Sequence, residues 1–254
     1  MIKIIALPAF RDNYIWTLHN QQYAVVVDPG DASPVLDYLD RHNLRLVAIL
    51  CTHHHHDHTD GIHRLHELYS VPVYGPSLEA IPCVSHTPDD GEIIEISELP
   101  VRMQVMHVPG HTRRHIAYAG ASGVFCGDTL FGCGCGRIFD GTVEQLFHSL
   151  KRLASLPDET RVYCTHEYTE VNIRFALACE PGNARLRQRQ ADTQSLRAAG
   201  LPTLPSTIAL EKATNPFLRC NVPEIVARVS GLTQVNNTGE FGVFSALRTL
   251  RNHF

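Results

Sequence analysis

The 254-residue chain lacks the features of several specialised classes of protein. It has no apolar run approaching the roughly 18 residues that a membrane-spanning helix needs. The apolar start of the chain is interrupted by Arg11 and Asp12, whereas a secretory signal peptide has a long hydrophobic region and a cleavage site. We therefore expect a cytoplasmic protein that has no membrane partner.

The chain also lacks an excess of basic residues and a composition typical of disorder. Its formal net charge is −4, whereas dedicated nucleic-acid-binding proteins are normally basic, so we expect no nucleic-acid partner. Hydrophobic residues make up 44% of the chain, which is enough to bury a sizeable core and argues against intrinsic disorder. The length predicts one or two folded domains.

The eight cysteines follow no pattern typical of a disulfide framework or a cysteine-based zinc site. They are scattered, no CxxC pair occurs, and several lie within apolar runs. Such cysteines are typical of small buried hydrophobic residues in a reducing compartment. Cys133 and Cys135 flank one glycine and have the spacing of a reactive or metal-binding pair, but we interpret this segment as a Gly-rich turn that carries two incidental thiols.

Hydrophobic periodicity predicts irregularly alternating strands and helices up to residue 180. We expect strands at 2–7, 14–18, 23–27, 46–51, 92–96, 101–107, 116–118, 123–126 and 161–164. We expect helices at 34–42, 62–69, 143–153 and 171–178. Because the alternation is irregular, a mixed sheet is a better prediction than a purely parallel one. The sequence thus predicts an α/β (α+β) domain at 1–180.

The composition changes after Glu180-Pro-Gly182. The segment 184–199 is polar, rich in arginine and prone to form a helix, and further helices are expected at 222–229 and 244–251. We therefore predict a smaller, mostly helical domain at 181–254. We interpret the arginines from Arg185 to Arg197 as a solvated helix face.

A dense histidine motif directly follows the expected strand at 46–51. Residues two apart in an extended segment point the same way, so His53 and His55 can converge on one ion. A turn after them can direct Asp57 and His58 toward a second position nearby. Imidazole and carboxylate ligands suit zinc, iron or manganese. The motif therefore indicates a metal site.

A different register of the same motif is possible. It uses His54, His56 and His58, leaves Asp57 without a role and provides no second position, so we prefer the first register. In that register His54 and His56 face away from the metal. A solvated polyhistidine run is a poor explanation, because the motif follows an apolar strand and contains an acidic residue.

Three further strands also lead into residues that can bind metal. His111 follows the expected strand at 101–107, Asp128 follows 123–126 and His166 follows 161–164. A single histidine after a strand is more often a hydrogen-bonded loop residue. Four such strand ends together favour a common site, because loops at the ends of strands are where functional residues gather.

The motifs at these strand ends are typical of one superfamily. They are His53-x-His55-x-Asp57-His58, Gly110-His111-Thr112, Gly127-Asp128-Thr129-Leu130-Phe131 and Thr165-His166-Glu167-Tyr168-Thr169. With them the chain resembles the metallo-β-lactamase superfamily. The segments 126–131 and 134–137 and the helical C-terminal segment resemble glyoxalase II, the hydroxyacylglutathione hydrolases, within that superfamily. The resemblance extends over 7–254, essentially the whole chain.

The resemblance implies an αββα sandwich, a C-terminal helical segment that binds substrate, and two divalent metal ions per chain. Zinc is the expected metal, with iron and manganese as alternatives. By the same resemblance, the first ion is bound by His53, His55 and His111. The second is bound by Asp57, His58 and His166, and Asp128 bridges the two ions.

The resemblance also implies hydrolysis of a thioester. The expected enzyme is a hydroxyacylglutathione hydrolase that converts S-D-lactoylglutathione and other S-2-hydroxyacylglutathiones to glutathione and D-lactate or the corresponding acid, the second step of methylglyoxal detoxification. A hydroxide that bridges the metals is the expected nucleophile, because metal-bound water loses a proton near neutral pH. Asp57 is the expected catalytic residue, which orients the nucleophile. We expect a monomer whose only partner is this small-molecule substrate.

Glutathione contacts are implied in the same way. Glutathione carries carboxylates, and arginine is well suited to bind them in a bidentate manner. The expected substrate-binding residues are Arg137, Phe139, Tyr168, Arg248 and Arg251. Three positions differ from the usual family pattern: Phe139 replaces a common tyrosine, Arg251 replaces a usual lysine, and Arg113-Arg114 replaces Leu-Gly.

Other activities fit the superfamily motifs less well. A lactonase or β-lactamase is disfavoured by the segment 126–131 and the C-terminal helices, and a nuclease by the net charge. A mononuclear-iron persulfide dioxygenase is disfavoured because the second-site residues Asp57, His58 and His166 are all present. A metal-binding module without catalytic activity is disfavoured by the complete ligand set.

Overall fold

A computed structural model describes residues 2–233 and 239–254 of the chain. The chain divides into two compact units. Unit 1 comprises Met1–His107 and Arg114–Gly127, and unit 2 comprises Val108–Arg113 and Asp128–Phe254. The domain boundary that the sequence suggests at residue 180 stays a prediction.

Unit 1 contains a mixed sheet with the strand order β1-β2-β3-β4-β5. The strands are β1 (Lys3–Ala9), β2 (Asn13–His19), β3 (Tyr23–Val27), β4 (Arg45–Leu50) and β5 (Val73–Tyr74). The first three pair antiparallel, whereas β3, β4 and β5 pair parallel. The prediction of a mixed sheet is therefore confirmed. The apolar run of β4 is almost entirely buried, as expected for a strand that is covered on both faces.

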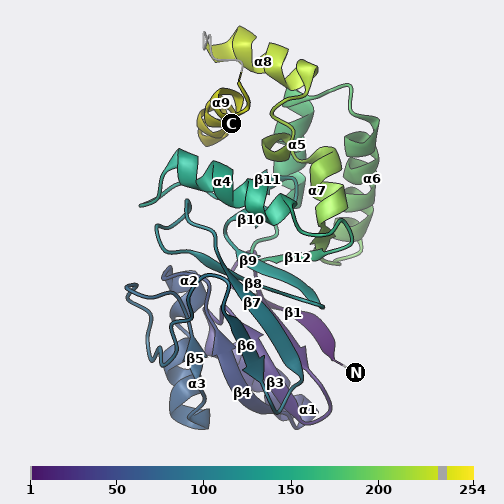
Figure 1. The fold of residues 1–254 in the computed structure, drawn as a ribbon. Helices are drawn as coiled ribbons and strands as arrows, with labels where there is room; N and C mark the ends of the chain where they lie inside the picture. Colours follow the sequence, from purple (N-terminus) through teal and green to yellow (C-terminus); the bar gives the residue numbers. More distant parts are fainter. Residues whose placement is uncertain (1, 234–238) are drawn as a thin grey trace. The chain divides into compact units, whose positions relative to one another are not determined.

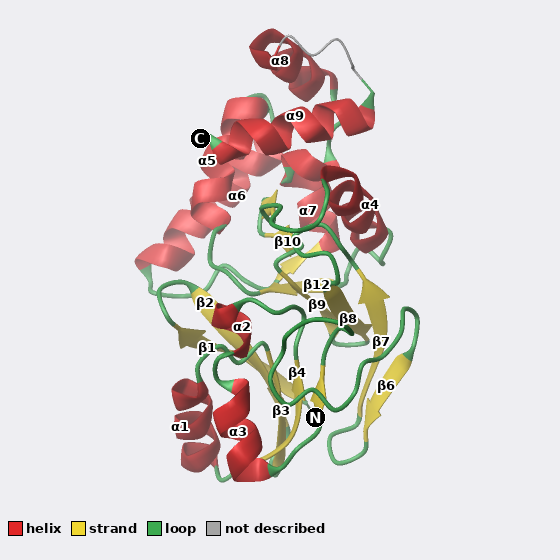
Figure 2. Cartoon of the chain, turned by 90° about the vertical axis from the view of Figure 1, so that its left-hand side faces the viewer, coloured by secondary structure: helices red, strands yellow, loops and turns green. Residues whose placement is uncertain are grey.

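Two helices pack beside each other against this sheet. They are α1 (Ala32–His42) and α3 (Ile62–Tyr69), and Figure 2 shows them side by side at the bottom of the view. Asp31 caps α1 by accepting a hydrogen bond of 2.8 Å from the backbone N–H of Ser33. The apolar face of α1 buries Val35 and Leu39 in the core of the unit, each contributing about 1.5–3 kcal/mol relative to an exposed position.

The strands of the second sheet that belong to unit 1 form an antiparallel meander. Its strands are β6 (Ile93–Ile96), β7 (Val101–His107), β8 (Ile116–Gly120) and β9 (Gly123–Gly127). The buried Tyr118 of β8 donates a hydrogen bond of 2.9 Å from its hydroxyl to the carbonyl of Cys51. This bond ties β8 to the chain segment where the histidine motif begins.

Unit 2 is mainly helical. Its helices are α4 (Val143–Ala154), α5 (Thr169–Cys179), α6 (Ala184–Ala198), α7 (Ile208–Thr214), the 3₁₀ turn η1 (Pro216–Leu218), α8 (Pro223–Thr233) and α9 (Glu240–Asn252). Figure 1 shows α5 and α6 adjacent to each other. Short antiparallel pairs join β10 (Leu130–Phe131) to β11 (Gly134–Cys135) and β12 (Arg161–Cys164) to β13 (Ser206–Thr207).

The helix α4 begins at a capping box, which fixes its start. Thr142 accepts a hydrogen bond from the backbone N–H of Gln145, whose side chain accepts one from the backbone N–H of Thr142. Two backbone donors of the first turn are thereby satisfied.

The long strands and helices expected from periodicity are confirmed. The sequence reading missed α2 (His56–Thr59), β5 and α7, which are too short to show a clear period. All eight cysteines are free thiols, and Cys133 and Cys135 lie in the β10–β11 hairpin. Within the described ranges, no helix is both long and apolar enough to cross a membrane.

One expectation about the arginine-rich helix is wrong for a single residue. Arg189 is only 5% exposed, whereas we expected the whole stretch to be a solvated face. Its guanidinium forms an ion pair of 2.6 Å with Glu211, which is fully buried. Sequence polarity did not reveal this arginine because its partner comes from another helix, 22 residues further along the chain.

Candidate metal centre

The predicted ligands of unit 1 lie close to one another after β4. We call this group cluster A; it consists of His53, His55, Asp57 and His58. His53 Nε2 is 3.1 Å from His55 Nδ1, and the rings of His53 and His58 have their centroids 4.1 Å apart. The short helix α2 carries Asp57 and His58 and brings His58 Nε2 within 3.7 Å of Asp57 Oδ2. These four side chains of unit 1 thus lie close together, and their roles as metal ligands stay a prediction.

A buried aspartate orients two of these histidines. Asp28 accepts hydrogen bonds from the backbone N–H of Thr52 at 2.7 Å and from its hydroxyl at 2.8 Å. His58 Nδ1 is 3.1 Å from Asp28 Oδ2, and a proton on Nδ1 is the arrangement in which this contact is attractive. Because the Thr52 hydroxyl donates to Asp28, it accepts from His53 Nδ1, which lies 3.0 Å away. Both histidines are thereby held with the lone pair on Nε2.

The carboxylate of Asp57 is also held in place. Asn13 Nδ2 donates to Asp57 Oδ2 at 2.9 Å and to the backbone carbonyl of Asp57 at 3.2 Å. The other two histidines of the motif turn elsewhere, because His54 pairs with Glu79 and the exposed His56 pairs with Asp60. These contacts support the register that uses His53 and His55 over its rival.

The predicted ligands of unit 2 form a second group, which we call cluster B. It consists of His111, Asp128 and His166. Asp128 Oδ2 is 3.5 Å from His111 Nε2 and 3.3 Å from His166 Nε2. His111 Nδ1 is 2.6 Å from the backbone carbonyl of Arg137. A carbonyl only accepts hydrogen bonds, so Nδ1 carries the proton and Nε2 presents its lone pair toward Asp128.

The donor atoms of both clusters fit a divalent metal ion. In cluster A the lone pair of His58 Nε2 faces the carboxylate of Asp57, and in cluster B that of His111 Nε2 faces Asp128. A cation between the nitrogen and the carboxylate of each pair would be bound by both. Imidazole nitrogens together with carboxylate oxygens are the ligands of zinc, iron and manganese.

Three of the expected substrate-binding residues lie beside cluster B. The ring of Phe139 is 61% exposed and meets the ring of His111 edge-on, with the centroids 5.1 Å apart. The guanidinium of Arg137 lies 6.0 Å from the centre of that phenyl ring. Tyr168 stacks on His166 with a centroid distance of 4.8 Å and an angle of 3° between the rings. A substrate that reaches cluster B in unit 2 would therefore encounter these side chains.

Arg248 and Arg251 lie on α9, where they contact other parts of unit 2. Arg248 is only 6% exposed and donates to the carbonyls of Cys135 at 3.0 Å and Gly136 at 3.2 Å. Arg251 is less buried and donates to Asn172 Oδ1 at 3.2 Å. Burial, and then the charge of Arg248, lower the pKa of Arg251.

The sequence reading missed the residues that support the ligands. Asp28 follows directly after β3 and so has the same signal of a strand end followed by a metal-competent residue, but it was not among the expected site residues. Asn13 and Thr52 carry no such signal, because neither side chain is a common ligand for metals.

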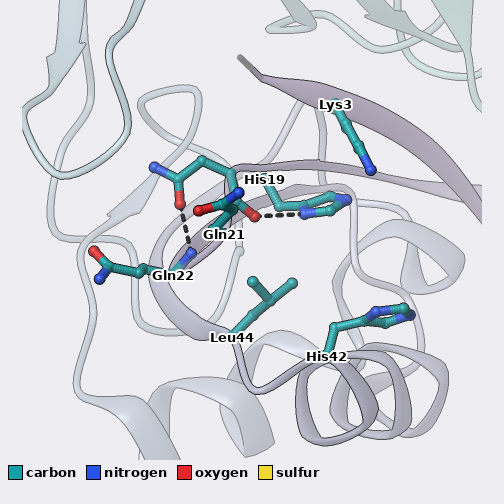
Figure 3. Close-up of a pocket in the computed structure, with 7 residues that line it drawn as sticks. Lys3, His19, Gln21, Gln22, His42 and Leu44 are labelled. Carbon is teal, nitrogen blue, oxygen red and sulfur yellow. Dashed lines mark hydrogen bonds between the residues drawn. The ribbon is translucent and has the colours of Figure 1, made fainter.

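A separate polar pocket lies far from cluster A along β4. Its volume is about 710 Å³, and Figure 3 shows the side chains that line it. They are Lys3, His19, Asn20, Gln21, Gln22, His42 and Leu44. His42 and Leu44 precede β4, whereas cluster A follows it, and none of the predicted ligands lines this pocket.

Comparison with known proteins identifies the class. Residues 10–166 match the family model described as the metallo-β-lactamase superfamily. A crystal structure of ETHE1 from Myxococcus xanthus has a TM-score of 0.66 at 25% identity, covering 98% of this chain and 99% of that one. A crystal structure of TTHA1623 in a di-iron-bound form has a TM-score of 0.60 at 27% identity, covering 85% of this chain and 100% of that one. The fold is thus that of the metallo-β-lactamase superfamily, whose members bind divalent metal ions, and the predicted α/β class is confirmed.

The family within this superfamily follows from closer relatives. Residues 167–254 match the family model described as hydroxyacylglutathione hydrolase C-terminus. The hydroxyacylglutathione hydrolase of Nitrosomonas europaea is 51% identical over 254 residues, which is 100% of this chain and 97% of the relative. The chain therefore belongs to the hydroxyacylglutathione hydrolase family of enzymes, as its motifs suggested.

Proposed function

We propose that the chain hydrolyses S-D-lactoylglutathione and other S-2-hydroxyacylglutathiones to glutathione and the free hydroxy acid, which is D-lactate for the first substrate. This reaction is the second step of methylglyoxal detoxification. The observation that carries the proposal is the identity of 51% over the full length to a hydroxyacylglutathione hydrolase. The presence of all seven expected metal ligands supports it, because no ligand position has been lost.

We further propose how the seven ligands divide between two metal ions. His53, His55 and His111 bind the first ion, and Asp57, His58 and His166 bind the second. Asp128 bridges them, which the contacts of its carboxylate with both histidines of cluster B support. Zinc is the proposed metal, with iron and manganese as alternatives. When bound, the two ions supply a bridging hydroxide nucleophile near neutral pH and polarise the substrate carbonyl.

The protein's own residues orient the reacting groups. Asp57, held by Asn13, accepts a hydrogen bond from the attacking nucleophile and directs it toward the acyl carbon. Arg137, Phe139, Tyr168, Arg248 and Arg251 form the proposed glutathione site. Arg251 can pair with a carboxylate of glutathione, and Tyr168 offers a hydroxyl to the tripeptide. The leaving group is a thiolate of a thiol with a pKa of about 8.5, so no strong general acid is needed.

A direct assay tests the activity. Purified protein with metal restored should release free thiol from S-D-lactoylglutathione, followed with a thiol-reactive chromophore. Metal analysis of the same sample should give two ions per chain. No release of thiol from protein that contains both ions would refute the proposed activity. Oxygen consumption with glutathione persulfide would instead identify a dioxygenase.

The remaining properties need separate measurements. We propose a cytoplasmic monomer without nucleic-acid or membrane partners. Sedimentation equilibrium at micromolar concentration should give the mass of one chain, 28.3 kDa, and a mass of twice that value would contradict the proposal.

A further inference from the structure

The segment between Asp128 and Arg137 connects one residue of cluster B to the carbonyl that holds another, His111. It leaves Asp128, forms the β10–β11 hairpin, and returns to Arg137, whose carbonyl accepts the hydrogen bond from His111. Gly136 lies so close to Asp128 on the return that an added Cβ would be 2.0 Å from the carbonyl oxygen of Asp128. The position of the hairpin is thus coupled to the position of a ligand at each end.

A fully buried carboxylate holds the tip of this hairpin. Glu211 Oε2 accepts hydrogen bonds from the backbone N–H of Cys133 at 2.8 Å and from Asn215 Nδ2 at 3.0 Å. Asn215 in turn donates to the carbonyl of Gly134 at 2.9 Å. Cys133 has a φ of 61°, in the left-handed region that is unfavourable for a residue with a side chain. A strained turn keeps its shape only if its surroundings fix it, and here the carboxylate does so.

The other oxygen of the same carboxylate faces a buried arginine. Glu211 Oε1 accepts from Arg189 Nη2 at 2.6 Å and also from the hydroxyl of Ser206. Arg189 is held further by a bond of 2.6 Å to the hydroxyl of Thr214. Each oxygen of Glu211 therefore accepts two hydrogen bonds, and its charge is balanced by Arg189. A neutral amide cannot replace it, because its NH₂ group would face the donor Arg189 in one orientation and the donors of Cys133 and Asn215 in the other.

We propose that Glu211 is a positioning residue for the metal centre: through Cys133 and Asn215 it fixes the hairpin that sets the positions of Asp128 and of the Arg137 carbonyl. Arg189 holds Glu211 in place through their ion pair. Neither residue contacts the predicted ligands, and Glu211 lies 83 positions after Asp128 in the sequence. This inference concerns the same site as the proposed function and builds on it.

The test compares Glu211→Gln with a matched variant of the same unit. Arg219→Gln is the control, because it breaks an ion pair with Glu180 at 2.6 Å but touches no residue of the hairpin among the described contacts. The first measurement is the zinc affinity of each folded variant, by competition with a chromophoric chelator. Glu211→Gln should bind at least one zinc ion about 10- to 100-fold more weakly, as is typical for loss of a group that orients ligands. Arg219→Gln should keep the wild-type affinity.

Kinetics with S-D-lactoylglutathione provide a second measurement. At saturating zinc, Glu211→Gln should lose about tenfold or more in kcat, because the ligands move. Arg189→Lys keeps Glu211 and a positive charge opposite it, and should retain most of the wild-type zinc affinity and kcat. Equal zinc affinity in Glu211→Gln and wild type would overturn the proposal, and so would equal losses of affinity in Glu211→Gln and Arg219→Gln.

Two precautions keep the test decisive. If Glu211→Gln does not fold, Asn215→Ser takes its place, since it removes the bond to Gly134 and leaves the Arg189–Glu211 pair intact. Serine can still cap the following turn, where Asn215 accepts from the N–H of Phe217. Zinc affinity is measured without turnover. Wild-type protein that binds zinc but releases no thiol would therefore refute the proposed function, while the zinc comparison would still decide the role of Glu211.

Discussion

The carboxylate of Asp28 offers the sharpest test of how the histidines of cluster A are oriented. In the variant Asp28→Asn one oxygen becomes an NH₂ group. If the remaining oxygen faces the N–H of Thr52, the NH₂ group faces His58 Nδ1–H, and two donors oppose each other. His58 can resolve this conflict only by moving its proton to Nε2. That nitrogen then has no lone pair to offer to a metal ion.

The expected loss can be estimated from these contacts. Removing a group that orients a metal-bound histidine weakens metal binding by about 10- to 100-fold, or roughly 1.4–2.7 kcal/mol. Loss of the charge that accepts the two hydrogen bonds of Thr52 lowers the free energy of unfolding by about 1.5–3 kcal/mol. In a chain of this size, that corresponds to a fall in Tm of roughly 4–10 °C without metal.

Two assays measure the two losses separately. Competition with a chelator gives the zinc affinity, and calorimetry of the metal-free protein gives Tm. Asp60→Asn is the matched control, because Asp60 is an exposed aspartate of the same unit whose partner is the exposed His56. We expect Asp60→Asn to match wild type in both assays. A zinc affinity of Asp28→Asn within twofold of wild type would refute the assigned proton positions of His58.

Three further variants test other parts of the molecule. Asn13→Ala should lower kcat about tenfold with little change in KM, because the Asp57 carboxylate loses the hydrogen bond that holds it. An unchanged kcat would show that Asn13 does not orient Asp57 for the reaction. Arg251→Gln should raise KM for S-D-lactoylglutathione with kcat retained, and an unaltered KM would place glutathione elsewhere. Burial raises the pKa of Cys179 to about 12, whereas an unfolded thiol ionises near pH 8.5. Between these values the unfolded state binds fewer protons than the folded state, so the free energy of unfolding should fall as pH rises. Cys179→Ala should therefore show a smaller fall in Tm between pH 9 and 11 than wild type. An equal dependence of Tm on pH in the two proteins would contradict this account.

Long elements and strand ends could be predicted from the sequence because their signals are local. The buried run of β4 and the amphipathic pattern of α1 each lie within a dozen residues. The candidate ligands could be proposed because each lies within a few residues of a strand end or on the short helix that follows one. The short helix α2 was not predicted, because four residues are too few to show a hydrophobic period.

The supporting groups could not be predicted for a different reason. Arg189 and Glu211 resemble surface residues in their own helices, and only the packing of α6 against α7 makes them a buried pair. Arg248 was expected to bind substrate, a role that stays a proposal, and its hydrogen bonds to Cys135 and Gly136 could not be read from the pattern of α9. Partners that are distant in sequence leave no local pattern.

The bond between His111 and the carbonyl of Arg137 has a consequence for the evolution of the enzyme. The acceptor belongs to the main chain, so no exchange of the side chain at position 137 removes it. That side chain, which we propose to contact the substrate, can therefore change while the proton of His111 stays on Nδ1. His58 lacks this protection, because its acceptor is the side chain of Asp28, and one base change in the codon can delete it. Directed evolution for new substrates should therefore randomise position 137 and leave position 28 untouched.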